Sequence, residues 1–233
     1  MIIDCVADLH GEFPKLDGGD LLIIAGDLTA SDLKDQYIHF CSQIRHAGYK
    51  KIIVIAGNHD NLMQNEPQFF LSNDHVSYLC DSGTEFEYDE IINHPASTEH
   101  VSIDVLMSQK RKLKIWGSPW TKTFPGMNPH CKAFTCDTDE ELAEKWALIP
   151  DDIDILITHS PSFGNLDCNY KKESYGSVSL WMMCLLIKPK LHIFGHVHEG
   201  YGQFKHCNGI HLVNASIMNG DYEPVNKPIR IIL

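Results

Sequence analysis

Long apolar runs, separated by polar segments, mark the first quarter of the chain. Residues 21–25 and 52–56 contain only Leu, Ile, Val and Ala, and residues 2–6 form a similar run interrupted by Asp4. Such runs are typical of strands buried on both faces of a sheet. Between the second and third runs, apolar side chains recur at helical spacing, at Leu33, Tyr37, Phe40, Cys41 and Ile44. The order strand, helix, strand predicts a right-handed crossover in a largely parallel sheet.

Capping signals and periodicity predict the helices. Ser31 or Asp32 can cap the first helix, and Gly48 can end it. Thr138 and Glu141 have the spacing of a capping box for a short helix over residues 140–148. A third helix is predicted to end near Pro189. Its apolar positions are Val178, Trp181, Met182, Leu185 and Leu186.

The other apolar segments predict further strands, at residues 76–79, 86–88, 113–116, 153–157, 191–194, 210–213 and 229–232. Residues 90–112 are polar with weak periodicity, so we expect a loop or hairpin insertion there, in which His94 is a weaker candidate for lining a site. We find no internal repeat and no linker. A single α/β domain over residues 1–233 is therefore expected.

Composition narrows the classes of function. The 233 residues include 19 Lys and Arg against 31 Asp and Glu, which gives a formal net charge of -12. This balance argues against nonspecific binding of duplex nucleic acid, which requires a basic face. A small phosphorylated substrate remains compatible, because metal ions can supply local positive charge.

The cysteines and the apolar runs bear on location. The eight cysteines are scattered without a CxxC pair, which favours reduced thiols in a cytoplasmic protein, although Cys131 and Cys136 are close enough in sequence to pair or bind metal. The residues from Met1 to Asp4 lack the features of a signal peptide. No apolar run approaches the roughly 20 residues that span a membrane, so no membrane partner is expected.

Five short motifs collect Asp, His and Asn, and four of them directly follow an apolar run. They are Asp8-Leu9-His10, Gly26-Asp27, Gly57-Asn58-His59-Asp60, His159 in Thr158-His159-Ser160, and Gly195-His196-Val197-His198. Taken singly, each motif also fits an ordinary turn, loop or strand end. Because neighbouring parallel strands deliver the loops that follow them to one edge of the sheet, we expect the motifs to meet there.

Together these side chains have the composition of a site for two metal ions. Asp8 and His10 are two residues apart and can face one ion, and the two carboxylate oxygens of Asp27 can bridge a pair. Asn58, His159, His196 and His198 complete the set. Mixed nitrogen and oxygen ligands suit Mn, Fe, Zn or Co, with Mn favoured, better than Ca or Mg. Two such ions would hold a phosphoryl group and activate a bridging water as the nucleophile.

A proton donor for the leaving group is also present. His59 neighbours Asn58 and points elsewhere if Asn58 faces the metals, so it is the candidate acid. Asp60 is expected to orient the His59 ring and raise its pKa.

In combination, these motifs resemble the calcineurin-like metallophosphoesterase family over most of the chain. The resemblance implies a four-layer sandwich of two mixed β-sheets flanked by α-helices. It implies one metal held by Asp8, His10, Asp27 and His198. It also implies a second metal held by Asp27, Asn58, His159 and His196, with His59 assisting the leaving group.

A narrower resemblance points to the metallophosphoesterase-domain-containing branch of that family. It is carried by residues 115–120, 153–159 and 188–202. That branch is similar to phosphodiesterases acting on nucleotide-type diesters, including cyclic nucleotides. Residues 90–112 look longer than the branch pattern. Candidates to contact a base or sugar lie near the motifs, with ordinary packing as the alternative for each: Trp120, Phe163, Asn165 and Tyr201.

The leading hypothesis is a dinuclear phosphodiesterase that hydrolyses small nucleotide-type diesters, cyclic ones included. One alternative is a phosphomonoesterase acting on nucleotides or phosphoproteins. Another is a non-catalytic scaffold, which the complete set of ligand positions disfavours.

Overall fold

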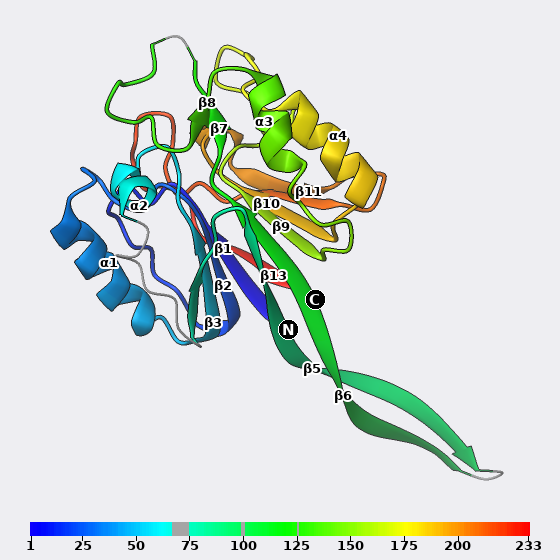
Figure 1. Cartoon of the computed structure of the whole chain (residues 1–233). Coiled ribbons are helices and arrows are strands. Elements are labelled where there is room, and N and C mark those ends of the chain that lie inside the picture. The colour runs from blue at the N-terminus through cyan, green and yellow to red at the C-terminus, as the bar shows by residue number, and fades with distance from the viewer. Residues whose placement is uncertain (67–74, 99–100, 125) are drawn as a thin grey trace.

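Two β-sheets packed face to face form the centre of the molecule (Figure 1). The structure, a computed structural model, describes residues 1–66, 75–98, 101–124 and 126–233. In the first sheet, β1 to β4 are parallel and β13 is an antiparallel edge strand. Its order is β13 (Ile229–Ile232), β1 (Ile2–Val6), β2 (Gly19–Ala25), β3 (Tyr49–Ile55) and β4 (Val76–Tyr78).

The second sheet is also mixed, with four parallel strands between two antiparallel edge strands. Its order is β11 (Gly202–Lys205), β12 (His211–Asn214), β10 (Leu191–Phe194), β9 (Ile155–Thr158), β6 (Val101–Ser118) and β5 (Ser82–Thr98). A small parallel pair joins β7 (Thr121–Lys122) and β8 (Thr135–Cys136).

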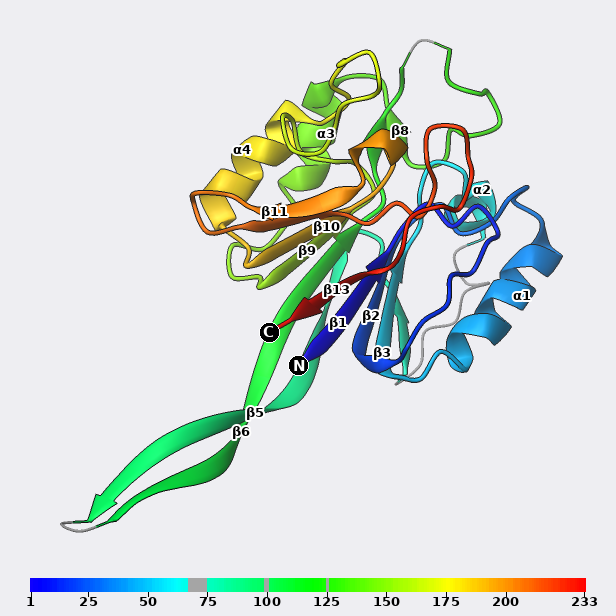
Figure 2. The ribbon, with the colours of Figure 1, turned by 180° about the vertical axis from the view of Figure 1, so that it is seen from behind.

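Helices cover the outer face of each sheet, which completes four layers (Figures 1 and 2). The first sheet carries α1 (Lys34–Arg45) and α2 (Asn61–Asn65), and the second carries α3 (Asp139–Trp146) and α4 (Val178–Ile187). The predicted fold, two mixed sheets flanked by helices, is confirmed. Among the described residues, no helix has the length and apolar character needed to cross a membrane.

Burial on both faces explains the continuous apolar runs. In β2, Leu21 and Ile23 pack between the two sheets, whereas Leu22 and Ile24 pack beneath the helices of the first sheet. Successive side chains of a strand point to opposite faces, so a strand covered on both sides must be apolar at every position.

The predicted capping of the helices is half correct. At α3, the Glu141 amide donates to Thr138 Oγ1 at 3.2 Å and the Thr138 amide donates to Glu141 Oε2 at 3.2 Å, so the capping box is confirmed. At α1, the N-cap residue is Leu33 rather than Ser31 or Asp32, and its side chain makes no capping bond. Asp32 instead accepts a hydrogen bond from the Tyr37 hydroxyl at 2.7 Å, which ties the segment before α1 to the first turn of the helix.

The helix predicted to end near Pro189 is present as α4, but the apolar positions that predicted it do not form its buried face. Val178, Met182 and Leu186 are 51%, 62% and 76% exposed, and the fully buried residues are Leu180 and Cys184. Nearly every residue of this helix is apolar, so periodicity could not distinguish its two faces. The helix ends at Lys188, whose left-handed backbone (φ 51°) precedes Pro189.

Residues 90–98 and 101–112 lie in two long antiparallel strands that project from the body (Figures 1 and 2). Strands β5 and β6 pair from Ser82 with Gly117 outward to Thr98 with Val101. Exposed ion pairs join the two strands, including Arg111 with Glu90 at 2.7 Å. The side chain of His94 lies outside the described residues.

We predict that Ser177→Ala lowers the free energy of unfolding by about 2–4 kcal/mol. Ser177 Oγ caps α4 by accepting from the Leu180 amide at 3.1 Å, and it accepts from the fully buried Trp146 indole at 3.1 Å. Its loss leaves the indole N–H without a partner. Urea denaturation measures the change. The exposed Ser31→Ala should stay within about 0.5 kcal/mol of wild type, and an equal effect of both variants would contradict this account.

Candidate metal centre

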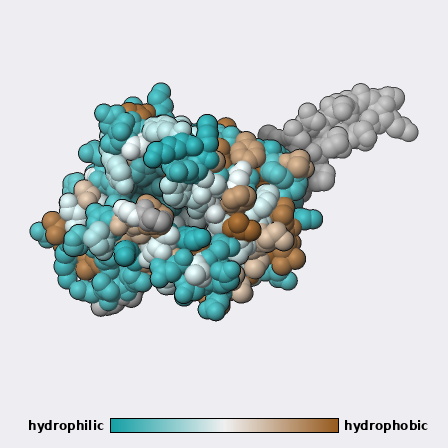
Figure 3. Space-filling view, turned by 90° about the horizontal axis from the view of Figure 1, so that it is seen from above, coloured by the Kyte–Doolittle hydropathy of each residue, from teal (hydrophilic) through white to brown (hydrophobic). Residues whose placement is uncertain are grey.

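The five motifs follow the carboxyl ends of strands from both sheets. Asp8 and His10 follow β1, Asp27 follows β2, Asn58 and His59 follow β3, His159 follows β9, and His196 and His198 follow β10. The two sheets therefore deliver these loops to one end of the sandwich. Figure 3 shows the molecule from this end, where most of the surface is hydrophilic.

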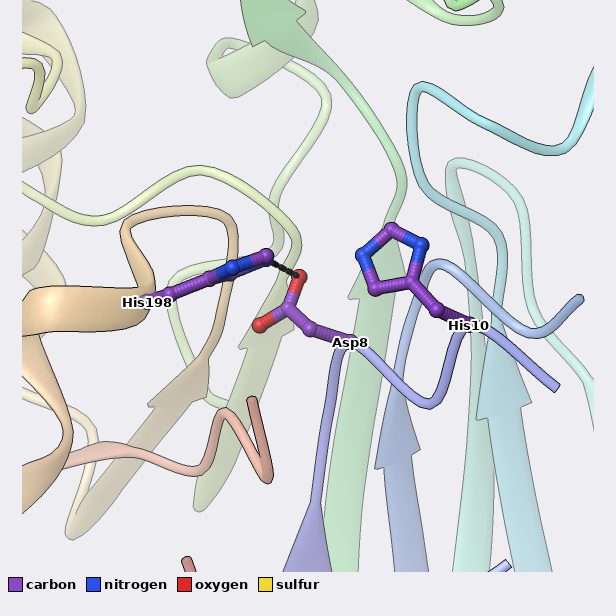
Figure 4. Close-up of side chains that lie close together, drawn as sticks. All are labelled: Asp8, His10 and His198. Atoms are coloured by element: carbon purple, nitrogen blue, oxygen red, sulfur yellow. Dashed lines mark ion pairs between the residues drawn. The ribbon is translucent and has the colours of Figure 1, made fainter. Parts of the chain in front are cut away.

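Asp8, His10 and His198 form one group whose ligand atoms lie within 4.8 Å of one another. Figure 4 shows the Asp8 carboxylate between the two imidazoles, with His198 reaching it from the loop after β10. The His198 Nε2 to Asp8 Oδ1 distance is 3.7 Å. Asp8 is fully buried, so these side chains meet away from bulk water.

Asp27 connects this group to a second one. Its Oδ2 lies 3.8 Å from His10 Nε2 and 3.3 Å from His159 Nε2. Asp8, Asp27 and His159 again present ligand atoms within 4.8 Å of one another. One Asp27 carboxylate thus faces both groups, as the sequence predicted for a bridging ligand.

Asn58 completes the second group. Its Oδ1 lies 3.0 Å from His159 Nε2 and 2.9 Å from His196 Nδ1. Its amide nitrogen donates to the Cys131 carbonyl at 3.2 Å, which keeps the oxygen turned toward the histidines. The structure therefore brings together all seven side chains that the sequence predicted as metal ligands.

Backbone carbonyls orient two of the imidazoles. His159 Nδ1 donates to the Ala25 carbonyl at 2.9 Å, and His198 Nδ1 donates to the Asn219 carbonyl at 3.1 Å. Because a carbonyl can only accept, Nδ1 carries the proton and Nε2 faces the carboxylates. Ligating histidines in proteins are commonly held in this way.

The backbone at this edge is strained. Asp8, His10, Asp27 and His196 have φ of 52°, 43°, 54° and 70°. Residues other than glycine rarely adopt this left-handed region, and such strain clusters at functional sites. Beside them, Gly26 has φ 98°, and a Cβ there would lie 2.6 Å from His159 Nδ1. The close approach of β2 to His159 therefore requires glycine.

The chemistry of the donors fits a pair of divalent transition ions. His10 Nε2 is buried and has no hydrogen-bond partner among the described residues, although it faces Asp27. An unpartnered buried nitrogen is costly unless something binds it. Imidazole nitrogens mixed with carboxylate and amide oxygens form the set that such ions prefer.

The protein's own histidines offset the two buried carboxylates. Burial on its own raises the pKa of Asp8, but the hydrogen bond and charge of His198 outweigh it and hold this pKa at about 2. Burial lowers the pKa of His159, but the charge and hydrogen bond of Asp27, together with Asp8 and the Ala25 carbonyl, outweigh it and raise this pKa to about 9. Metal ions would replace these protons, so metal binding is expected to release protons.

His59 also belongs to this cluster, because His10, Asp27 and His59 present ligand atoms within 4.8 Å of one another. Its Nε2 lies 3.9 Å from Asp27 Oδ2, its Nδ1 lies 3.3 Å from Cys131 Sγ, and its backbone amide donates to Asp27 Oδ1 at 2.9 Å. The ring lines the adjoining cavity. The predicted contact between Asp60 and this ring is absent from the described contacts.

Asp60 instead supports the loops that carry Asp27 and Asn58. Its buried carboxylate accepts from the backbone amides of Gly57 at 2.7 Å and Leu28 at 3.1 Å, and its Oδ1 lies 2.8 Å from the Tyr37 hydroxyl oxygen. Burial, together with the charge of Asp27, raises the pKa of Asp60 to about 7. Asp60 bonds to the Gly57 turn and is not among the residues that line the cavity.

A cavity of about 530 Å³ adjoins the cluster and is lined by Asp27, Asn58, His59, His196 and His198. Its other walls come from residues that sequence reasoning missed. They are Phe124, Met127, Asn128, Cys131, Asn169, Tyr175, Val197, Glu199 and Tyr222. Most of them lie in irregular loops without periodicity, although Glu199 directly follows a predicted ligand and could have been considered.

None of the four predicted substrate contacts is among the residues that line this cavity. Trp120 donates through its indole to Asp81 Oδ2 at 2.7 Å, and Tyr201 donates to the Lys227 carbonyl at 2.9 Å. Asn165 donates to Ser162 Oγ at 3.1 Å, and Phe163 is 46% exposed. Nearness in sequence to a motif did not turn these side chains toward the cavity.

Comparison with known proteins shows which family has this arrangement of candidate metal ligands. Residues 1–200 match the family described as calcineurin-like phosphoesterase. The chain belongs to this family. Calcineurin-like phosphoesterases depend on two metal ions, in agreement with the two groups that share Asp27.

Relatives agree with this assignment. The chain is 35% identical to the human metallophosphoesterase domain-containing protein 1, over 98% of this chain and 70% of that protein. It is 30% identical to the UPF0046 protein K07C11.7 of Caenorhabditis elegans, over 97% of this chain and 72% of that protein. One solved crystal structure superposes with a TM-score of 0.57 at 13% identity, covering 91% and 89% of the two chains, which supports the fold alone.

We predict that Mn²⁺ raises the melting temperature and that the wild type binds about two ions per chain. At about 100 times the dissociation constant, one bound ion adds about 2.7 kcal/mol to the stability. Asp27→Asn should lose most of the bound metal because it alters the carboxylate that both groups share. Elemental analysis and thermal melts measure this, with the exposed His39→Gln as control. Equal metal content in wild type and Asp27→Asn would contradict the shared site.

Proposed function

We propose that this calcineurin-like phosphoesterase is a dinuclear phosphodiesterase that hydrolyses small nucleotide-type diesters, cyclic ones included. The observation that carries the proposal is the position of Asp27, whose carboxylate faces both groups of candidate ligands. Asp8, His10, Asp27 and His198 would hold one ion, and Asp27, Asn58, His159 and His196 would hold the other. When bound, the ions would act as Lewis acids on the phosphoryl oxygens and lower the pKa of a water.

His59 is placed to supply a proton to the leaving oxygen. Its ring lines the cavity, with Nε2 3.9 Å from Asp27 Oδ2. Two contacts hold His59: its backbone amide donates to Asp27 Oδ1, and Nδ1 of its ring lies 3.3 Å from Cys131 Sγ. Asp60 would contribute indirectly, by holding the backbone of the Gly57 turn.

The walls of the cavity favour a diester over a monoester. A phosphate monoester carries up to two negative charges, whereas a diester carries one. None of the described residues lining the cavity is Lys or Arg, so the cavity offers no permanently cationic side chain for a second charge. Phe124, Tyr175 and Tyr222 offer ring surfaces for the organic part of a substrate.

We predict that His59→Ala retains its metal but lowers kcat by about 10²–10⁴-fold, the usual contribution of a general acid. Asp27→Ala should abolish activity together with metal binding. The assay is hydrolysis of bis(p-nitrophenyl) phosphate with added Mn²⁺, alongside elemental analysis of each variant. The control His39→Gln should match wild type. Full activity in both Asp27→Ala and His59→Ala would refute the assigned site.

We also predict that kcat/KM for bis(p-nitrophenyl) phosphate exceeds that for p-nitrophenyl phosphate by at least about tenfold, a difference of 1.4 kcal/mol. Both substrates release the same chromophore, so the comparison isolates the second ester group. A preference for the monoester would favour the phosphomonoesterase alternative. A protein that binds metal but hydrolyses neither ester would favour the non-catalytic scaffold.

A further inference from the structure

We propose that Phe124, Tyr175 and Glu199 form a substituent subsite beside the metal centre, which selects phosphodiesters by the charge of the group that they carry. This subsite accepts a neutral or cationic substituent and rejects one that bears a second phosphate. The inference rests on the proposed function, because it assumes that the reacting phosphoryl group lies at the metals.

Glu199 is fixed in place by a ligand loop. It lies in the short 3-10 helix His198–Gly200, directly after the candidate ligand His198, and lines the same cavity as Asp27 and His196. Across the described residues, no hydrogen bond or ion pair engages its half-buried carboxylate. A half-buried carboxylate without a partner is available to a ligand that enters the cavity.

Glycine at position 220 leaves room for this side chain. A Cβ on Gly220 would lie 3.1 Å from both Cγ and Oε1 of Glu199. The loop after β12 therefore passes directly against the carboxyl group and limits where it can move. The same loop carries Tyr222, whose ring lies 4.8 Å from that of His198 and which lines the same cavity as Glu199.

Two aromatic rings form another wall of the subsite. The rings of Phe124 and Tyr175 meet edge to face with centroids 5.5 Å apart, and Phe124 also lies 6.1 Å from the ring of the candidate ligand His196. The Tyr175 hydroxyl accepts from Asn169 Nδ2 at 3.3 Å and donates to Glu173 Oε2 at 3.3 Å. These bonds hold the Tyr175 ring at the cavity without using Glu199.

Charge and ring surface together define what the subsite accepts. A flat neutral ring or a cation is stabilised by aromatic faces, and a cation also by the Glu199 carboxylate. A second phosphate would face that carboxylate in a cavity where the described lining residues include no Lys or Arg. Repulsion between like charges is strong where water is partly excluded. Glu199 thus acts as a repulsive element, a common source of specificity.

The test uses two substrates that differ by one phosphate: thymidine 5′-(p-nitrophenyl phosphate) with and without a 3′-phosphate. Wild type should favour the substrate without the 3′-phosphate by at least about tenfold in kcat/KM. Glu199→Gln should reduce the preference to within about threefold, because it removes the negative charge that repels the 3′-phosphate. Glu199→Lys should reverse the preference, because it places a positive charge at the same position. The exposed Glu144→Gln should keep the wild-type ratio.

A binding measurement separates the subsite from the chemistry. Calorimetric titration of the Mn²⁺-loaded protein with thymidine 5′-phosphate and thymidine 3′,5′-bisphosphate should show the same order of preference. If neither diester is hydrolysed but this order holds and depends on Glu199, the proposed function fails and the subsite stands. The subsite is overturned by equal ratios in wild type and Glu199→Gln, by a wild-type preference for the bisphosphate, or by no binding of either nucleotide.

Discussion

Two carboxylates buried close together are the constraint on which the functional end of this molecule depends. Asp8 and Asp27 are 0% and 2% exposed, and their charges repel each other. A buried negative charge must be offset by positive charge close by. The side chains around the pair are the amide of Asn58 and five imidazoles, those of His10, His59, His159, His196 and His198. Only some of these histidines can carry an extra proton. The cluster is therefore better satisfied by cations than by protons.

The fold provides this arrangement at a local energetic cost. Four candidate ligands have left-handed backbone, which costs of the order of 1–3 kcal/mol each. The sheets beneath them are buried on both faces and supply the apolar packing that offsets this cost. The strands also fix the loops, because each ligand lies within a few residues of a strand end. Rigid strands and strained loops together hold the donors in position.

The sequence was most informative where burial dictates composition. The apolar runs of β2 and β3 could be predicted because strands covered on both faces contain almost no polar residues, and the motifs that follow them could be placed at one edge. The inner face of α4 could not be predicted, since the helix is apolar nearly all round. The cavity walls were missed because Phe124, Tyr175 and Tyr222 lie in loops, where tertiary contacts alone decide which way a ring points.

The central claim is that the Asp27 carboxylate lies between two cations. Anomalous diffraction from crystals grown with Mn²⁺ tests it most directly. The account predicts two anomalous peaks about 3.5–4 Å apart, one on each side of the Asp27 carboxylate. One of these peaks should lie near Asp8, His10 and His198, and the other near Asn58, His159 and His196. No peak, or a single peak that does not touch Asp27, would contradict the account.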